Sequence, residues 1–175
     1  MTAGNRDNRS AVLFVCMGNI CRSPTAEGVL RTMHRRLVPE LRLEIDSAGT
    51  HANYHLGEQP DRRSQQAAQL RGYDISGHRA RVVMPEDFDM FDYIVAMDHD
   101  NLRNLQKMRN ASARAELGLL LAYAPQTSLR SVPDPYHGGP AGFDKVLDLI
   151  EQGVRGLLRN LCTRQNIPFP EVESG

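Results

Sequence analysis

The chain lacks an excess of charge of either sign. Its 175 residues include 21 Lys plus Arg and 21 Asp plus Glu, so the formal net charge is zero. A general nucleic-acid binder or membrane-surface binder normally carries a basic excess or a basic stripe. The balanced charge therefore argues against both kinds of partner.

Cysteines are few, and long hydrophobic runs are missing. The sequence has three cysteines, Cys16, Cys21 and Cys162, which is too few for a disulfide scaffold and suits a reducing compartment. No apolar run approaches the roughly 20 residues that a membrane-spanning helix needs. Residues 1–10 are polar and show no signal-peptide pattern. We therefore expect a soluble, cytoplasmic protein.

Internal repeats, low-complexity blocks and the common nucleotide-binding motifs are also missing. The chain contains neither GxGxxG nor GxxxxGK followed by Ser or Thr. Its length suits one α/β domain with enough core to fold unaided. We predict a disordered lead-in over residues 1–10, one domain over residues 11–163 and a loose tail over residues 164–175.

The most informative stretch that is present runs from Val12 to Pro24. Apolar, mostly β-prone residues end at Cys16, a short turn follows, and Arg22 and Ser23 precede a helix that opens at Pro24. This order predicts a buried strand leading into a loop whose backbone amides surround an anion at a helix N-terminus. Cys16 and Arg22 would then face the same anion.

The rest of the chain alternates strand and helix patterns. We expect strands over residues 11–16, 41–47 and 92–98, helices over residues 24–37, 61–72, 99–108 and 143–161, and a fourth strand or a helix end over residues 117–123. Ser23 and Asp98 are the expected N-caps of the helices that follow them. The alternation predicts a three-layer α/β fold, in which a parallel sheet has helices on both faces and binds ligands at the carboxyl ends of its strands.

The residue types in the first loop indicate nucleophilic chemistry. A thiol attacks only as its thiolate, and the loop amides, the helix N-terminus and the guanidinium of Arg22 should all stabilise a thiolate at Cys16. The Ser23 hydroxyl adds a possible hydrogen bond to the sulfur. The planar fork of Arg22 can hold two oxygens of a tetrahedral dianion. A nucleophile inside an anion-binding loop indicates phosphoryl transfer to sulfur.

Such a transfer needs an acid for the leaving oxygen and then a base for water, and one carboxylate can serve both steps. Asp134 is our candidate, because the flanking prolines Pro133 and Pro135 stiffen the backbone around it. The residue pattern alone does not exclude other Asp or Glu residues as the general acid. Four arginines, Arg62, Arg63, Arg79 and Arg81, are interpreted as solvated charges, with steering of an anionic substrate towards the pocket as the alternative for some of them.

Together these segments resemble the low-molecular-weight protein tyrosine phosphatases. The resemblance is carried by VCMGNICRSPTAE, DSAGT, HRAR, FDYIVAMD and DPYHG, which follow the order and approximate spacing of that family between Ala11 and Leu161. It implies a four-stranded parallel sheet with a phosphate-binding loop after the first strand, and neither a metal nor a cofactor. It also implies hydrolysis of phosphotyrosine in proteins through a phosphocysteine intermediate.

The resemblance implies roles for individual residues. Cys16 would be the nucleophile, Arg22 the clamp on the phosphate and the transition state, and Asp134 the general acid and then the general base. The remaining phosphate-binding loop would be Met17, Gly18, Asn19, Ile20, Cys21 and Ser23. Asn19 would hold a strained loop conformation, supported by Ser47 and His78. Cys21 would form a protective disulfide with Cys16 under oxidation.

The resemblance also bears on the substrate. A bulky residue at the position of Ile20 accompanies phosphotyrosine preference in the family, whereas threonine there marks relatives that act on phosphoarginine. Tyr54 and Tyr136 would be the aromatic walls that pack the substrate ring. His137 stands where many members have a second tyrosine, so one aromatic of the rim is missing.

The implied partners are phosphotyrosine-containing proteins, among them a bacterial tyrosine kinase, and phosphate-like oxyanions would inhibit. We expect a monomer. An arsenate reductase of the same fold is one alternative, although it needs further redox cysteines. A phosphoarginine phosphatase is a second, opposed by Ile20. A phosphotyrosine-binding module without turnover is a third, and loss of Cys16, Arg22 or Asp134 would have been its signature.

Overall fold

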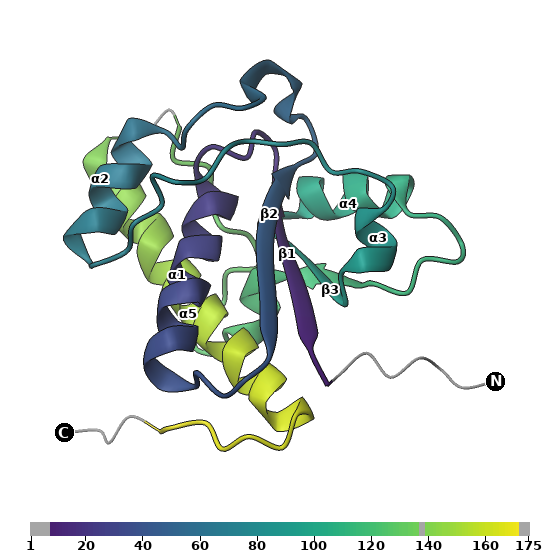
Figure 1. Cartoon of the computed structure of the whole chain (residues 1–175). Helices are drawn as coiled ribbons and strands as arrows, with labels where there is room; N and C mark the ends of the chain where they lie inside the picture. Colours follow the sequence, from purple (N-terminus) through teal and green to yellow (C-terminus); the bar gives the residue numbers. More distant parts are fainter. Residues whose placement is uncertain (1–7, 137–138, 172–175) are drawn as a thin grey trace.

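The chain forms one four-stranded parallel sheet with helices on both faces (Figure 1). A computed structural model describes residues 8–136 and 139–171 and gives the strand order β2-β1-β3-β4. The strands are β1 (Ser10–Cys16), β2 (Leu43–Gly49), β3 (Tyr93–Ala96) and β4 (Glu116–Leu119). The predicted three-layer α/β fold is confirmed.

The helices divide between the two faces of the sheet. They are α1 (Arg22–Leu37), α2 (Arg62–Leu70), α3 (Asp87–Met90), α4 (His99–Met108) and α5 (Pro140–Arg164), with short 3-10 helices η1 (Ala52–His55) and η2 (Leu120–Tyr123). α1 and α5 cover one face with α2 beside them, whereas α3 and α4 lie on the other (Figure 1). Within the described ranges, no helix is long and apolar enough to cross a membrane. The ambiguous pattern over residues 117–123 is a strand followed by a 3-10 helix.

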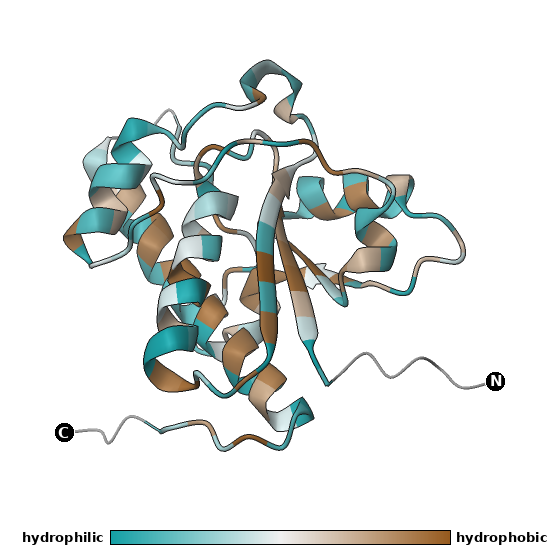
Figure 2. Cartoon of the chain, in the orientation of Figure 1, coloured by the Kyte–Doolittle hydropathy of each residue, from teal (hydrophilic) through white to brown (hydrophobic). Residues whose placement is uncertain are grey.

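β1 is buried along its whole length, because the central strand is covered on both faces. Val12 and Phe14 belong to the core beneath α1 and α5, and Leu13 and Val15 to the core beneath α3 and α4. In Figure 2, hydrophobic colour runs along β1 and α5, whereas the side of α1 facing the viewer is largely hydrophilic. Cys16 ends β1 on the α1 and α5 side.

α5 supplies the largest share of that core from one element. One face of the helix is a buried apolar stripe at helical spacing, which consists of Phe143, Val146, Leu147, Ile150, Val154, Leu157, Leu158 and Leu161. The helix begins at Pro140 rather than Phe143, since proline suits the first helical turn. It ends at Arg164 rather than Leu161.

Both predicted boundaries of the domain need correction. Ser10, assigned to the lead-in, is buried and pairs with Leu43 at the start of β1. The segment after α5 is not a loose tail as far as residue 171, because Ile167 and Phe169 pack against the core beside α5. The guanidinium of Arg159 lies 5.2 Å from the centre of the Phe169 ring and covers it. The outer parts of both predicted segments lie outside the described residues.

The helix ends follow local capping chemistry. The Asp61 side chain accepts a hydrogen bond from the backbone of Arg63 and caps α2. Gly72, with φ of +86°, lies just beyond the C-terminus of α2, where the left-handed conformation favours glycine. Asp98 caps α4 in a capping box with Asn101, which confirms its predicted N-cap role.

Candidate active site

The loop from Cys16 to Arg22 lies at the carboxyl end of the sheet, beside the end of β2. The backbone amide of Thr50 donates to the carbonyl of Cys16 at 3.0 Å, and that of His51 donates to the carbonyl of Met17 at 2.9 Å. A Cβ at Gly49 would lie 2.5 Å from the Met17 carbonyl oxygen, so this close approach requires glycine. The segment after β2 thus holds the first half of the loop.

The second half of the loop is held from the start of α2. The backbone amide of Asp61 donates to the carbonyl of Ile20 at 2.7 Å. Asp61 is also the N-cap of α2, so the orientation of that helix and the position of Ile20 are coupled. Two separate segments therefore fix the shape of the loop before any ligand binds.

The thiol of Cys16 is buried at the base of the loop, with 3% of the residue exposed. Its Sγ lies 2.9 Å from the Ser23 hydroxyl oxygen. The backbone amide of Asn19 donates to the same sulfur at 3.3 Å. Each of these two groups can place a hydrogen against the sulfur.

The side-chain amide of Asn19 holds the loop through four hydrogen bonds. Its φ of +57° lies in the left-handed region, which asparagine tolerates better than most residues. The Asn19 Nδ2 donates to the Ser23 hydroxyl at 2.9 Å and to the Ser47 hydroxyl at 3.1 Å. The Oδ1 accepts from His78 Nε2 at 3.0 Å and from the backbone amide of Arg81 at 2.9 Å. Both donors and both acceptor positions of the amide are occupied.

This network positions the Ser23 hydroxyl against the Cys16 sulfur. The Ser23 oxygen accepts from Asn19 and lies 2.9 Å from the Cys16 sulfur, whereas the Ala48 carbonyl oxygen is 3.5 Å away, so the shorter contact is the one with sulfur. The prediction that Ser23 caps α1 is wrong: the helix begins at Arg22, and Cys21 occupies the N-cap position without a side-chain cap. The Ser23 hydroxyl contacts the Cys16 sulfur instead of capping the helix.

A carboxylate that the sequence pattern does not identify completes the network. The Ser47 hydroxyl donates to Glu27 Oε1 at 2.9 Å, and His78 Nδ1 lies 3.5 Å from the same oxygen. Burial alone would raise the pKa of the Glu27 carboxyl, but hydrogen bonds from His78 and Ser47 lower it below its usual value. Glu27 escapes sequence reasoning because its partners come from β2 and the loop after α2, which only the fold brings together.

The Arg22 guanidinium is held by hydrogen bonds at Nη1, whereas its Nε and Nη2 edge is left for other partners. Its Nη1 donates to Asp98 Oδ2 at 2.6 Å and to the Val132 carbonyl at 3.0 Å. Its Nη2 lies 3.8 Å from Asp134 Oδ2. Burial alone would lower the pKa of this guanidinium, but the charges of Cys16 and Asp98 raise it. The edge carrying Nε and Nη2 makes no hydrogen bond with any described residue, so it can bind two oxygens of an anion.

The contact between Asp98 and Arg22 is a second relationship that sequence reasoning missed. Asp98 follows β3, which pairs with β1 through Ala96 and Val15. The carboxyl ends of neighbouring parallel strands meet at one edge, so the place of Asp98 after a strand was the available signal. The same carboxylate both caps α4 and orients Arg22.

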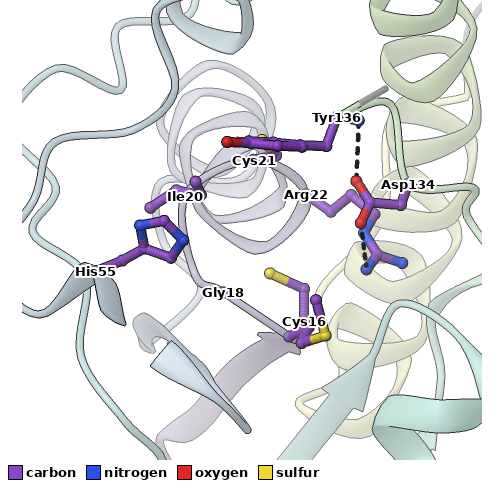
Figure 3. A pocket seen from close by; sticks show the side chains of 9 residues that line it. Cys16, Gly18, Ile20, Cys21, Arg22, His55, Asp134 and Tyr136 are labelled. Carbon is purple, nitrogen blue, oxygen red and sulfur yellow. Dashed lines mark hydrogen bonds and ion pairs between the residues drawn. The ribbon is translucent and has the colours of Figure 1, made fainter. Parts of the chain in front are cut away.

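A pocket of about 240 Å³ opens above the loop (Figure 3). It is lined by Cys16, Met17, Gly18, Ile20, Cys21, Arg22, His55, Asp134 and Tyr136. In Figure 3 the Cys16 sulfur points into the space, Arg22 and Asp134 lie on one side of it, and Ile20 and His55 lie on the opposite side. The nucleophile, clamp and acid inferred from the sequence therefore meet in one pocket.

The rim differs from the sequence expectation. Tyr136 lines the pocket, and its backbone amide donates to Asp134 Oδ1 at 3.0 Å. Tyr54 does not line it and is 91% exposed, because η1 turns the neighbouring His55 inward instead. His137 lies outside the described residues.

Two arginines interpreted as solvated charges have structural contacts instead. Arg63 lies 5.6 Å from the centre of the Tyr136 ring and donates from Nη2 to the Tyr136 carbonyl at 2.9 Å. Arg81 pairs with Asp46 and Asp87, each at 3.0 Å. Arg63 thus connects the start of α2 to the loop that carries Asp134.

Possible metal ligands and the remaining cysteines were located as well. In the part of the chain that the structure describes, no group of three or more His, Cys, Asp or Glu side chains is placed to hold a metal ion. All three cysteines are free thiols. Cys162 is buried in the core and lies apart from the residues that line the pocket.

The fold and the loop together define a class of α/β protein in which a loop at the start of a helix brings a cysteine and an arginine into one pocket. The family model of the low molecular weight phosphotyrosine protein phosphatases matches residues 11–166. The human low molecular weight phosphotyrosine protein phosphatase is 42% identical over 138 residues, which cover 78% of this chain and 85% of the human protein. The chain belongs to this family.

Solved structures agree with the family. A protein tyrosine phosphatase from Entamoeba histolytica superposes with a TM-score of 0.81 at 37% identity, covering 87% of this chain and 96% of that one. An arginine phosphatase from Drosophila superposes with a TM-score of 0.79 at 33% identity, covering 85% and 96%. The fold alone therefore does not choose between the two substrate classes.

Proposed function

We propose that this protein hydrolyses phosphotyrosine in proteins through a phosphocysteine intermediate. One observation carries the proposal. The Cys16 sulfur, hydrogen-bonded by Ser23 and by the Asn19 amide, shares a pocket with Arg22 and Asp134. Membership of a protein-tyrosine-phosphatase family supports the substrate class.

In the first step the Cys16 thiolate attacks phosphorus. The bond from sulfur to phosphorus forms, and the bond from phosphorus to the tyrosine oxygen breaks. The carboxylic acid of Asp134 gives its proton to the leaving oxygen, so tyrosine departs neutral. The Nε and Nη2 edge of Arg22 holds two of the phosphoryl oxygens, and the backbone amides of the loop stabilise the charge of the transition state.

In the second step water attacks the phosphocysteine. The carboxylate of Asp134 takes a proton from the water as the bond between oxygen and phosphorus forms. The bond between sulfur and phosphorus breaks, which restores the thiolate and releases inorganic phosphate. Asp134 is 44% exposed through its side chain, so water can reach it from the mouth of the pocket. Its loop therefore suits both halves of the reaction.

The walls of the pocket favour an aromatic ester. The Ile20 side chain and the Tyr136 ring are on its lining, and Cys16 lies at its base. A phosphoryl group must reach the buried sulfur, and the ring of phosphotyrosine provides that reach between apolar walls. Phosphoserine is shorter and leaves the walls uncovered. Ile20 also opposes phosphoarginine as the preferred substrate.

Hydrolysis of p-nitrophenyl phosphate tests the proposal. The wild-type protein should release phosphate, inorganic phosphate should inhibit competitively, and Cys16→Ser should abolish turnover. Cys162→Ser is the matched control, because it changes a buried thiol outside the pocket and should retain activity. Normal turnover by Cys16→Ser would contradict the proposed nucleophile.

The substrate alternatives need a second comparison. Rates on a phosphotyrosine peptide and on a phosphoarginine peptide should favour phosphotyrosine, and Ile20→Thr should narrow the difference. A higher rate on phosphoarginine would replace the proposal with the arginine phosphatase. Tight phosphopeptide binding without hydrolysis would support the binding module. A bacterial kinase as substrate, a monomeric state and a cytoplasmic location stay predictions.

A further inference from the structure

A second hollow, about 540 Å³ in volume, adjoins the candidate active site on the side of α4. It shares Met17, Arg22 and Asp134 with the catalytic pocket. The remaining lining comes from His51, from Asp98 at the N-cap of α4 and from one side of α4 itself. A substrate whose phosphoryl group lies on Cys16 therefore has a groove directly beside it.

The α4 side of this groove is a single polar helix face. Asp100, Arg103, Asn104 and Lys107 all line it. Their spacing of three, four and seven residues places them on one face of the helix. From Asp100 to Lys107 that face is about 10 Å long at 1.5 Å per residue. About three residues of extended peptide cover the same length.

Some of the charged side chains along the groove have an ion-pair partner within the described part of the chain, and one does not. At the inner end, Asp98 is paired with Arg22, and on α4 Arg103 is paired with Asp100. At the outer end Lys107 is exposed, and its ammonium has no ion-pair or hydrogen-bond partner among the residues that the structure describes. The groove thus offers one uncommitted positive charge, about two turns of helix beyond Asp100.

Met17 stands at the junction between the two hollows. This residue lines both of them and is 52% exposed. An exposed, flexible thioether at that point gives an apolar contact that adapts to different side chains. The groove therefore combines an apolar entry beside the pocket with a cation farther out.

We propose that this groove binds the peptide segment adjoining the phosphotyrosine, and that Lys107 selects an acidic residue about three positions away on one side. The inference rests on the proposed function and deepens it, because it assigns a sequence preference to the phosphotyrosine substrate. An acidic side chain at that point meets the unpaired ammonium. A basic one is repelled by it.

A peptide series tests the preference. Each peptide contains one phosphotyrosine in an otherwise neutral sequence. A single position is varied as Asp, Ala or Lys, and the series covers the four positions before and the four positions after the phosphotyrosine. For the wild type, Asp should raise kcat/KM over Lys by about two- to fivefold at one position near the third, the range expected for an exposed ion pair. Lys107→Glu should reverse the order at that position, and Lys107→Gln should remove it.

Lys145→Glu is the matched control, because it makes the same charge change at an exposed site on α5 that lines neither hollow. It should keep the wild-type preference. All the variants should hydrolyse p-nitrophenyl phosphate at the wild-type rate, since that substrate does not reach the groove. Equal rates on every peptide, or an unchanged order in Lys107→Glu, would overturn the groove assignment while leaving the proposed function intact.

Peptide binding measured by calorimetry, in the wild type and in the Cys16→Ser variant, separates the groove proposal from the proposed hydrolysis. A wild-type protein that binds the acidic peptides more tightly but never hydrolyses them would contradict the proposed function and support the groove. Binding that is equal for acidic and basic peptides would overturn the groove whatever the rate of turnover.

Discussion

Arg22 and Asp98 are 76 residues apart in the sequence and are joined by a hydrogen bond of 2.6 Å. The contact takes up Nη1, together with the Val132 carbonyl, and leaves the Nε and Nη2 edge facing the loop. Arg22 is only 4% exposed, so its guanidinium has little freedom to turn. The edge that we propose binds the phosphoryl group is therefore oriented before substrate arrives, which lowers the free-energy cost of binding.

Asp98→Asn should separate orientation of Arg22 from helix capping. Asparagine is as good an N-cap as aspartate, so α4 should stay intact and thermal unfolding should change little. Loss of the charge frees the guanidinium, and kcat/KM on p-nitrophenyl phosphate should fall by about 10- to 100-fold. Steady-state kinetics beside thermal melts measure both effects. Wild-type kcat/KM in a folded Asp98→Asn protein would rule out the orienting role.

Asp134→Ala should show whether this carboxylate protonates the leaving group. A general acid matters most when the leaving oxygen is a strong base, so turnover of phenyl phosphate should fall by about 10²- to 10⁴-fold. Turnover of p-nitrophenyl phosphate should fall much less, because p-nitrophenolate leaves readily without a proton. Equal losses on the two substrates would mean that Asp134 acts in some other way.

Arg63 should act on the Asp134 loop from a distance. Arg63→Ala removes the hydrogen bond to the Tyr136 carbonyl and the contact with the Tyr136 ring. The loop that carries Asp134 then loses one anchor, and kcat on phenyl phosphate should fall by about tenfold with little change in KM. The Arg63→Lys variant should retain only part of the wild-type kcat, because lysine lacks the planar guanidinium. The neighbouring exposed Arg62→Ala is the control, and an equal effect there would contradict the assignment.

Cys21 should protect Cys16 from irreversible oxidation. Both side chains line the same pocket, and burial raises the pKa of the Cys21 thiol to about 12, so peroxide should oxidise Cys16 first. The resulting sulfenic acid should then condense with the Cys21 thiol, forming a disulfide and releasing water. Dithiothreitol should restore activity to the oxidised wild type but far less to oxidised Cys21→Ser. Equal recovery, or a mapped disulfide to Cys162, would count against this pairing.

The parts of the fold that follow from local pattern are the parts that the sequence predicts well. The stripe of α5, the alternation of strands and helices, and the cap at Asp98 all depend on residues within one element. The loop from Cys16 to Ser23 is similarly local, because an amide-rich turn at a helix start binds anions wherever it occurs. Its distant partner Asp134 was identified through the family resemblance as much as through its prolines.

The parts that escape prediction depend on contacts between distant elements or on a rotation of a single residue. Glu27 and Asp98 acquire their roles only when β2 and β3 lie on either side of β1. Tyr54 and His55 are adjacent in a 3-10 helix, and no periodicity in such a short element tells which of them faces the pocket. The packing of Ile167 and Phe169 depends on the end of α5 meeting the rest of the core.

Trapping of the phosphoenzyme tests the central claim most directly. Wild-type protein and the Asp134→Ala variant are mixed with p-nitrophenyl phosphate, quenched within the first turnovers, digested and analysed by mass spectrometry. The account predicts one added phosphoryl group on the peptide that contains Cys16, at higher occupancy in Asp134→Ala, because loss of the base slows hydrolysis of the intermediate. An unmodified Cys16 peptide during active turnover, or a phosphoryl group on another residue, would contradict it.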